Sequence, residues 1–444
     1  MGIWLEIFSD IVSHDIVLLW LSVSLIILGV FFVKQLRIYD ISTAAALCDP
    51  VVISVIFSEL TAAIVPVFMY FYDWMYDETF FISYVLTEMA LFIGIFLMKG
   101  RSSISSFHIC IDKKIDISTY IRKKAYIIIT SIYVLSKFMY FFSVGIPLFS
   151  DSYYTTLMSQ STFLARFNIS LYLIVCMLWL DSFSYIKSKC NYIVGIIILG
   201  TFVLSAQKGL ISYFLFAFFF IELYKLKRGK KTMVISRKVI LLSLILILSF
   251  VMIQLVVQAM DHDEWNPLVM LIIRVMGNGD SFPIFYGMGQ TAGILQEHTG
   301  ISEFIVANLS VFKIDFGYNS DYIPNNELAA ILSSAVSEFV SPVIKHNIIG
   351  IKIFGLYFSW IYSLFIGLAI GFISRCLYRR MININFFVYI IYCDIYVGVT
   401  NCLSNYIISG YFDSVFINGF LLLIIYVIFH NPHVTFFKAE GDRS

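Results

Sequence analysis

The sequence predicts an all-α polytopic membrane protein with about 11 (10–12) transmembrane helices and a large outer loop that contains short interfacial helices. Three observations predict this fold class. The chain of 444 residues is 60% hydrophobic and only 13% charged, whereas a soluble domain carries about 25% charged residues. Apolar runs of near-membrane length recur along the chain, and basic residues gather between alternate runs. We expect one integral membrane domain over residues 1–444, with the outer loop over residues 258–350.

The apolar runs, taken in order, define the expected spans. A helix that crosses a bilayer needs about 20 mostly apolar residues. We expect spans near 16–33, 51–72, 80–98, 125–148, 167–186, 192–205, 210–224, 239–257, 351–374, 386–401 and 406–428. The runs on either side of Lys208 are short, which is why the expected number has a range.

The basic residues predict the orientation, because Lys and Arg are enriched in cytoplasmic loops. Of the 30 basic residues, all but seven follow an odd-numbered span or lie near the C-terminal end. That side is therefore predicted to be the cytoplasm, and the loop over 258–350 is predicted to face outward. The seven exceptions are Lys137, Arg166, Lys208, Arg274, Lys313, Lys345 and Lys352.

These exceptions need a physical reason. A cation at membrane depth costs roughly 2.5–3.5 kcal/mol unless it is paired or hydrated. Each is therefore either a long side chain that reaches the lipid headgroups or a placed functional group. We favour the headgroup interpretation for Lys137 and Lys352, and leave both open for Arg166, Lys208 and Arg274.

Acidic residues inside expected spans pose the same question. Asp181 and Asp413 lie near span ends, where we expect water to hydrate them. Glu59, Glu88 and Asp394 lie deeper, where we expect internal pairs or a cavity. Such buried acids would also suit the proton relay of a transporter.

The outer loop carries ten acids, Asp261, Asp263, Glu264, Asp280, Glu297, Glu303, Asp315, Asp321, Glu327 and Glu338, against only Arg274, Lys313 and Lys345. Isolated cations among so many acids suggest side chains with a specific functional role rather than charges that keep the loop soluble. Asp280 is interpreted first as the ion partner of Arg274, and otherwise as a catalytic carboxylate. His298 and His346 are interpreted here as solvated loop residues.

Several short motifs follow one another in a particular order. Gly145-Ile-Pro-Leu-Phe149 precedes Arg166, and Ser205-Ala-Gln-Lys-Gly-Leu210 follows it. Arg274 then precedes Gly279-Asp280, and the loop leads into Gly350-Ile-Lys-Ile-Phe-Gly355. In this order, over about residues 130–375, the set resembles the Wzy-type O-antigen (oligosaccharide repeat-unit) polymerases.

The resemblance implies a GT-C-like membrane glycosyltransferase architecture in the bacterial inner membrane, with the loop in the periplasm. Such enzymes join oligosaccharide repeat units carried on undecaprenyl pyrophosphate into O-antigen, a part of lipopolysaccharide, or a related surface polysaccharide. It implies catalytic roles for Arg166, Arg274, Asp280, Glu338 and His346, and substrate-binding roles for Lys208, Tyr153 and Tyr286. Arginine suits a pyrophosphate because its planar fork binds phosphate oxygens in pairs, and a carboxylate or His suits the sugar hydroxyl as general base.

The resemblance also implies further partners, namely membrane lipids, a chain-length regulator and a flippase. The alternatives are a lipid-linked oligosaccharide flippase and an O-antigen ligase. A net charge of +1 gives no reason to expect a nucleic-acid partner. No metal or other cofactor is expected, and the seven cysteines are expected to be free thiols without metal-ligand spacing.

Overall fold

The computed structural model describes residues 29, 47–55, 78–99, 119–147, 163–186, 189–205, 209–227, 300–310, 344–379, 385–406 and 409–430. The regular elements in these ranges are all helices, and no strand occurs among them. The all-α prediction is therefore confirmed for this part of the chain. The expected spans at 16–33 and 239–257 lie outside it, apart from residue 29.

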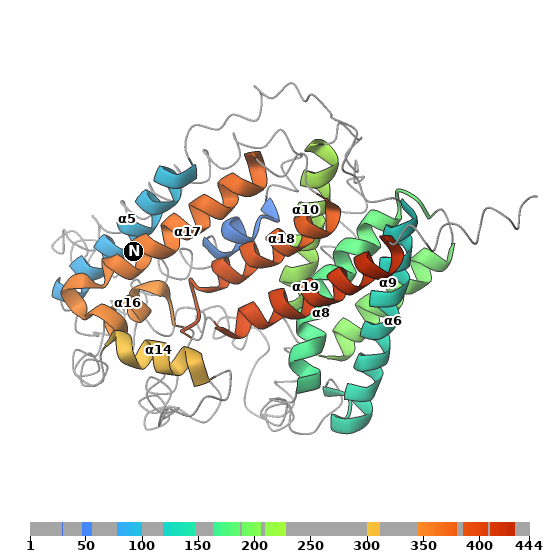
Figure 1. Ribbon diagram of the computed structural model, residues 1–444. Helices are drawn as coiled ribbons and strands as arrows, with labels where there is room; N and C mark the ends of the chain where they lie inside the picture. The colour runs from blue at the N-terminus through green and yellow to red at the C-terminus, as the bar shows by residue number, and fades with distance from the viewer. Residues whose placement is uncertain are drawn as a thin grey trace, which may run out of the picture.

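The labelled elements in chain order are α5 (Glu78–Lys99), α6 (Thr119–Val144), α8 (Phe163–Ser182), α9 (Lys189–Leu204), α10 (Gly209–Lys227), α14 (Ile301–Ser310), α16 (His346–Phe354), the 3-10 helix η5 (Leu356–Phe358), α17 (Trp360–Arg379), α18 (Phe386–Asn401) and α19 (Ser409–His430). They form two groups, α5 with α16 and α17, and α6 with α8, α9 and α10 (Figure 1). Helices α18 and α19 connect the groups, since α18 packs on α17 and α19 packs on both α6 and α8.

Helices α5 and α17 run in the same direction and pack closely along their length (Figure 1). Near their starts the hydroxyl oxygens of Ser83 and Ser359 lie 2.9 Å apart. Further along, Gly367 lies directly against the backbone of Leu91, and a Cβ on Gly371 would lie 2.6 Å from a backbone oxygen of α5. Small residues let two backbones approach in this way. The shared direction agrees with the predicted alternation, in which both helices run from the outer side to the cytoplasmic side.

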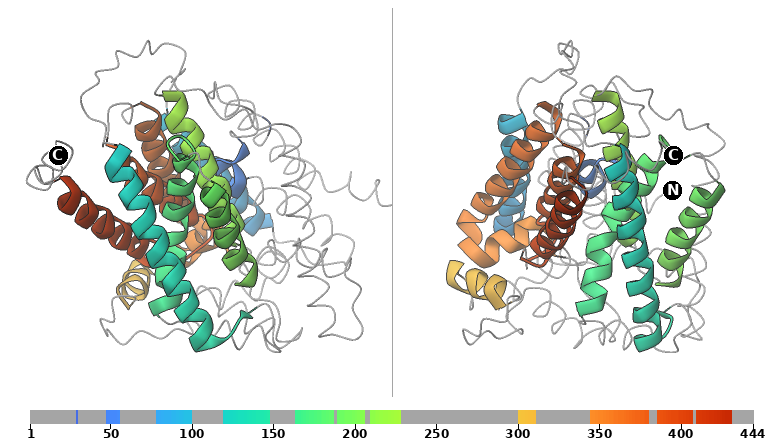
Figure 2. Two further views of the ribbon diagram at one scale, coloured as in Figure 1. Left: turned by 90° about the vertical axis from the view of Figure 1, so that its right-hand side faces the viewer. Right: turned by 45° about the vertical axis from the view of Figure 1, so that its right-hand side comes forward.

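Helices α6 and α8 are antiparallel. Ser136, near the end of α6, hydrogen-bonds Asn168, near the start of α8, at 2.5 Å. Arg122, near the start of α6, lies 3.5 Å from Asp181 at the end of α8. Figure 2 shows α6 and α8 side by side, with α10 beside α8. This is again the relative direction that the alternating basic loops predict.

The prediction of one continuous helix over 351–374 is wrong in its first part. Helix α16 ends at Phe354, and Gly355 follows with φ 76°, a left-handed conformation that favours glycine. After the short η5, α17 begins at Trp360. Gly350 lies directly against the backbone of Ser359, which lets α16 fold back on the start of α17. The sequence pattern missed this break because the residues on both sides are equally apolar.

Apolar side chains cover much of the outside of the described helices. Two stretches, Thr119–Val144 and Leu356–Tyr378, are long and apolar enough to cross a membrane, and five shorter apolar helices accompany them. Large side chains point outward from α6, α9 and α19, among them Phe142 at 89%, Ile196 at 69% and Phe416 at 69% exposure. The number of spans stays a prediction.

Candidate functional site

The candidate site lies where α16 meets α5 and α17. His346 begins α16 and is only 2% exposed, although it follows a polar segment of the chain. Its ring lies between Glu88 from the middle of α5 and Ser363 from the first turn of α17, and both of these side chains are buried as well. The interpretation of His346 as a solvated loop residue is therefore wrong.

Both nitrogens of the His346 ring have a partner. Nε2 lies 3.2 Å from Oε1 of Glu88, and Nδ1 lies 2.8 Å from the hydroxyl oxygen of Ser363. When Glu88 is ionised it accepts the Nε2 proton, which leaves Nδ1 as the acceptor of the Ser363 hydroxyl proton. The order carboxylate, imidazole, hydroxyl is that of a general-base relay, in which the acid fixes the tautomer and orientation of the ring.

The close packing of α5 on α17 holds this relay in place. One turn before the relay, the Ser83 hydroxyl contacts the Ser359 hydroxyl at 2.9 Å and the Leu356 carbonyl at 3.3 Å. These contacts fix the start of α17, from which Ser363 projects. Because both backbones are in contact at their glycines, the depth of Glu88 relative to Ser363 is set by the helix register.

The surrounding helix ends form a common boundary. The Tyr362 hydroxyl donates to the Cys402 carbonyl at 3.1 Å, which ties the start of α17 to the end of α18. On α14, Phe304 packs edge-on against Tyr406, with ring centroids 5.3 Å apart. In the predicted orientation all of these are outer ends, so the relay lies toward the outer side.

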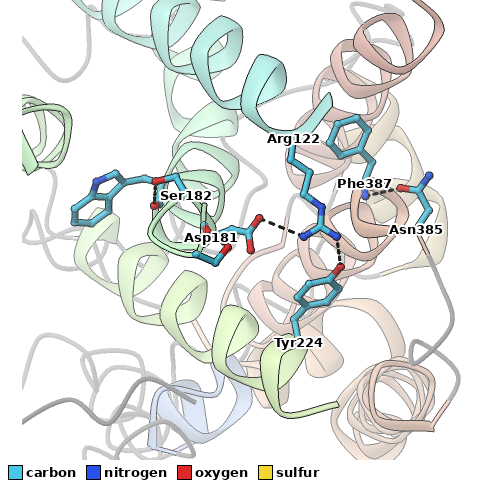
Figure 3. Close-up of polar contacts among 8 residues, drawn as sticks. Arg122, Asp181, Ser182, Tyr224, Asn385 and Phe387 are labelled. Atoms are coloured by element: carbon cyan, nitrogen blue, oxygen red, sulfur yellow. Dashed lines mark hydrogen bonds and ion pairs between the residues drawn. The ribbon is translucent and has the colours of Figure 1, made fainter. Parts of the chain in front are cut away.

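A second buried polar cluster lies at the opposite helix ends (Figure 3). The Arg122 guanidinium lies 3.5 Å from the Asp181 carboxylate and donates to the Tyr224 hydroxyl at 2.8 Å. It also lies 4.6 Å from the centroid of the Phe386 ring, a cation–π contact. The expectation that Asp181 is hydrated is wrong, since it is 3% exposed. This cluster joins four helices and is interpreted as structural.

Two further buried acids link distant helices. Asp394 of α18 accepts from Ser414 at 3.2 Å and from Asn418 at 2.8 Å, both on α19, which confirms the expected internal partners. Asp49, fully buried, accepts from the hydroxyls of Tyr378 at 3.3 Å and Tyr396 at 3.0 Å. Asp49 is not among the acids expected to be buried, because an Asp-Pro pair is typical of an ordinary helix start.

The expected snorkelling of Lys137 and Lys352 is wrong. Lys137 is 2% exposed and Lys352 is fully buried. Both side chains are therefore enclosed by protein, whereas a snorkelling lysine would extend its ammonium to the headgroups. Spacing along the sequence could not distinguish a lipid-facing position from a protein-facing one.

Most of the predicted site residues lie outside the described ranges. These are Tyr153, Lys208, Arg274, Asp280, Tyr286 and Glu338. Arg166 lies in the first turn of α8, and its backbone alone is described. Helix α8 packs against α6, α10 and α19, whereas α16 packs against α5 and α17. Arg166 and His346 thus belong to different helix groups.

The structure brings Ser363, His346 and Glu88 together as one hydrogen-bonded group. Glu88 was noted as a buried acid that needs a partner, and His346 supplies it. Ser363 carried no signal, because a single serine in an apolar helix commonly bonds its own backbone. Among the described side chains, no group of three or more His, Cys, Asp or Glu could hold a metal ion.

Comparison with known proteins adds no relative. No protein-family model, no curated protein and no solved structure matches the chain.

Proposed function

We propose that this chain is a polytopic inner-membrane glycosyltransferase that polymerises undecaprenyl-pyrophosphate-linked repeat units on the periplasmic face. The observation that carries the proposal is the buried His346, set between Glu88 at 3.2 Å and Ser363 at 2.8 Å. A sugar hydroxyl is a weak nucleophile, and it needs a base to take its proton as it attacks. The relay supplies one at a helix end that the charge pattern assigns to the outer side.

The membrane setting is supported by the outward-facing apolar side chains. Phe138, Met139 and Phe142 on α6 are each more than half exposed, as are Phe420 and Leu423 on α19. A protein surrounded by water rarely exposes large apolar patches, whereas lipid tails cover such helices at no cost. The hydropathy of the candidate spans agrees with this setting.

The proposed reaction divides the work between a base and cations. The acceptor hydroxyl gives its proton to the Ser363 oxygen as the Ser363 proton passes to Nδ1 of His346, and the acceptor oxygen forms the new bond to the anomeric carbon of the donor. The donor pyrophosphate leaves with the bonding electrons, and negative charge grows on it. Arg274 and Lys208 of the outer segments are proposed to stabilise that charge, and Asp280 or Glu338 remains an alternative base. Arg166 is proposed to bind pyrophosphate as well.

A flippase is the second candidate function. It is favoured by the number of ionisable side chains inside the helix assembly, above all Asp394, which is 3% exposed. Buried acids of this kind suit proton-coupled transport. His346 and Ser363 lie at the starts of α16 and α17, which suits a reaction near one face better than passage through the protein.

Deletion of the gene separates the candidates through the glycans on the cell surface. Loss of a polymerase leaves single repeat units exported and attached, and loss of a flippase leaves nothing exported. Loss of a ligase removes even the single-unit product from the surface lipid. The proposal expects single units in the deletion strain and restored long chains when the wild-type gene is returned; either of the other two patterns contradicts it.

A further inference from the structure

Lys137 is a buried cation that the relay does not use. It lies seven residues before the end of α6 and is 2% exposed. Its ammonium nitrogen lies 5.1 Å from the centroid of the Tyr140 ring and 5.6 Å from that of Phe141. These rings lie three and four residues further along α6, on the same face of the helix as Lys137.

No carboxylate contacts this ammonium in the part of the chain that the structure describes. Other buried cations of the same helix group differ in this respect. Arg122 lies 3.5 Å from the carboxylate of Asp181, and Lys225 lies 3.8 Å from that of Glu222. A buried charge needs a compensating one, and two aromatic rings supply only part of what an anion would.

A second cationic position lies at the same level on the neighbouring helix. Two hydrogen bonds, at 2.5 Å and 3.4 Å, join Ser136 and Asn168 and fix the register of α6 against α8. Lys137 is one residue beyond Ser136 toward the outer end, and Arg166 is two residues beyond Asn168. At a rise of about 1.5 Å per residue, their Cα atoms differ in level by only about 1.5 Å.

We infer that Lys137 is the buried cation of an anion site at the outer ends of α6 and α8, and that this site binds the pyrophosphate of the acceptor substrate. The identity of the ligand rests on the proposed function. Both substrates of such a polymerase carry a lipid pyrophosphate, so the enzyme must bind two of them. Only the donor pyrophosphate is next to the reacting sugar, because the attacking hydroxyl is at the other end of the acceptor glycan.

The position of Lys137 favours the acceptor. His346 belongs to the group of α5, α16 and α17, and Lys137 belongs to the group of α6 and α8 (Figure 1). Helices α18 and α19 connect these groups (Figure 2). A pyrophosphate on Lys137 is therefore in another part of the assembly from the base, as is needed when a repeat unit extends between the two.

Binding stoichiometry tests the inference. The full chain is placed in nanodiscs of phosphatidylcholine, and undecaprenyl pyrophosphate without a glycan is titrated in and counted by native mass spectrometry. We expect two bound diphosphates per wild-type chain. Lys137→Met should weaken one of them at least tenfold, and Lys137→Arg should restore it. Lys123→Met changes an exposed lysine of the same helix and should leave both in place.

The possible results are distinct. Two bound diphosphates in Lys137→Met overturn the inference and leave the polymerase proposal intact. A single one in the wild type also overturns the inference. No binding by the wild type overturns the polymerase proposal itself. Phosphatidylglycerol that displaces the Lys137-dependent diphosphate at equal concentration reveals an ordinary headgroup contact and overturns the inference. Lys137→Gln, which keeps a polar side chain, replaces the Met variant should the latter fail to fold.

Discussion

Glu88 Oε1 lies 3.2 Å from Nε2 of His346, and both side chains are almost fully buried. The two residues are far apart in sequence and are brought together because α16 folds back against α5 and α17. A buried imidazole with an acid on one side and a hydroxyl on the other is rarely retained for packing alone, since apolar side chains would fill the same space at lower cost.

Loss of the Glu88 carboxylate should destabilise the protein by an amount that depends on the replacement. Glu88→Ala removes the carboxylate that accepts the buried ring N–H of His346, which costs about 1–3 kcal/mol. Glu88→Gln keeps an oxygen acceptor at the same place and should cost less. Chemical denaturation in detergent measures both free energies of unfolding. Equal losses for the two variants would show that the Glu88–His346 contact contributes nothing.

Glycine-to-alanine substitution should destabilise the protein where α5 and α17 are in close contact. The same substitution should stabilise it at a helical glycine with open space around it. A Cβ on Gly367 would meet the backbone of Leu91, so Gly367→Ala should cost about 1–3 kcal/mol. Gly200 on α9 has nothing within 4 Å of the added atom, so Gly200→Ala should stabilise by up to about 1 kcal/mol through helix propensity. Thermal unfolding of the two variants checks this. A harmless Gly367→Ala would contradict the described packing.

Arg122 and Asp181 should behave as a coupled pair. Arg122→Met leaves a buried carboxylate without its cation, which costs about 3–5 kcal/mol. Lys123→Met removes the neighbouring, exposed charge and should change stability by less than about 0.5 kcal/mol. When Asp181→Asn is combined with Arg122→Met, the loss should be smaller than the sum of the single losses. Simple additivity in this double-mutant cycle would refute the contact.

Cysteine labelling tests the orientation and the environment of Cys48 together. Burial, with a smaller contribution from the charge of Asp49, raises the pKa of the Cys48 thiol to about 12. About one molecule in 10,000 is then a thiolate at pH 8, so a maleimide should react slowly, and faster only as the pH rises toward 12. Cys190 is exposed at the start of α9. In variants that keep one cysteine, a membrane-impermeant maleimide should label Cys190 from the cytoplasmic side. Labelling from outside would invert the predicted orientation.

Much of the helical architecture could be predicted from the sequence because long apolar helices are encoded by long, simple patterns. The apolar runs gave α5, α9, α10 and α18 within about three residues of their observed bounds, and α6 and α8 within about six. The basic loops gave the relative directions of α5 and α17 and of α6 and α8. A uniformly apolar run, however, does not show where one helix ends and the next begins. The apolar run that contains Gly355 hid the end of α16, and only the positive φ of that glycine shows the break.

The candidate site was only partly predictable. Glu88 was visible as an acid inside an expected span, whereas His346 was interpreted first as a solvated histidine of the outer loop. Their pairing depends on how α16 folds back, which no local pattern specifies. Burial was misjudged for Lys137, Asp181 and Lys352 for the same reason: sequence position gives depth along a helix, whereas the face that meets protein is set by packing.

Reconstitution tests the central claim most directly. The purified chain is placed in liposomes with the undecaprenyl-pyrophosphate-linked repeat unit, and the length of the glycan product is followed with time. We expect the wild type to make long chains, His346→Ala to be slower by about 10² to 10⁴, and Ser363→Ala to retain an intermediate rate. His298→Ala, which changes a histidine of the outer loop, should be as fast as the wild type. If His346→Ala and the wild type polymerise at the same rate, the Ser363–His346–Glu88 relay is not the base of this reaction.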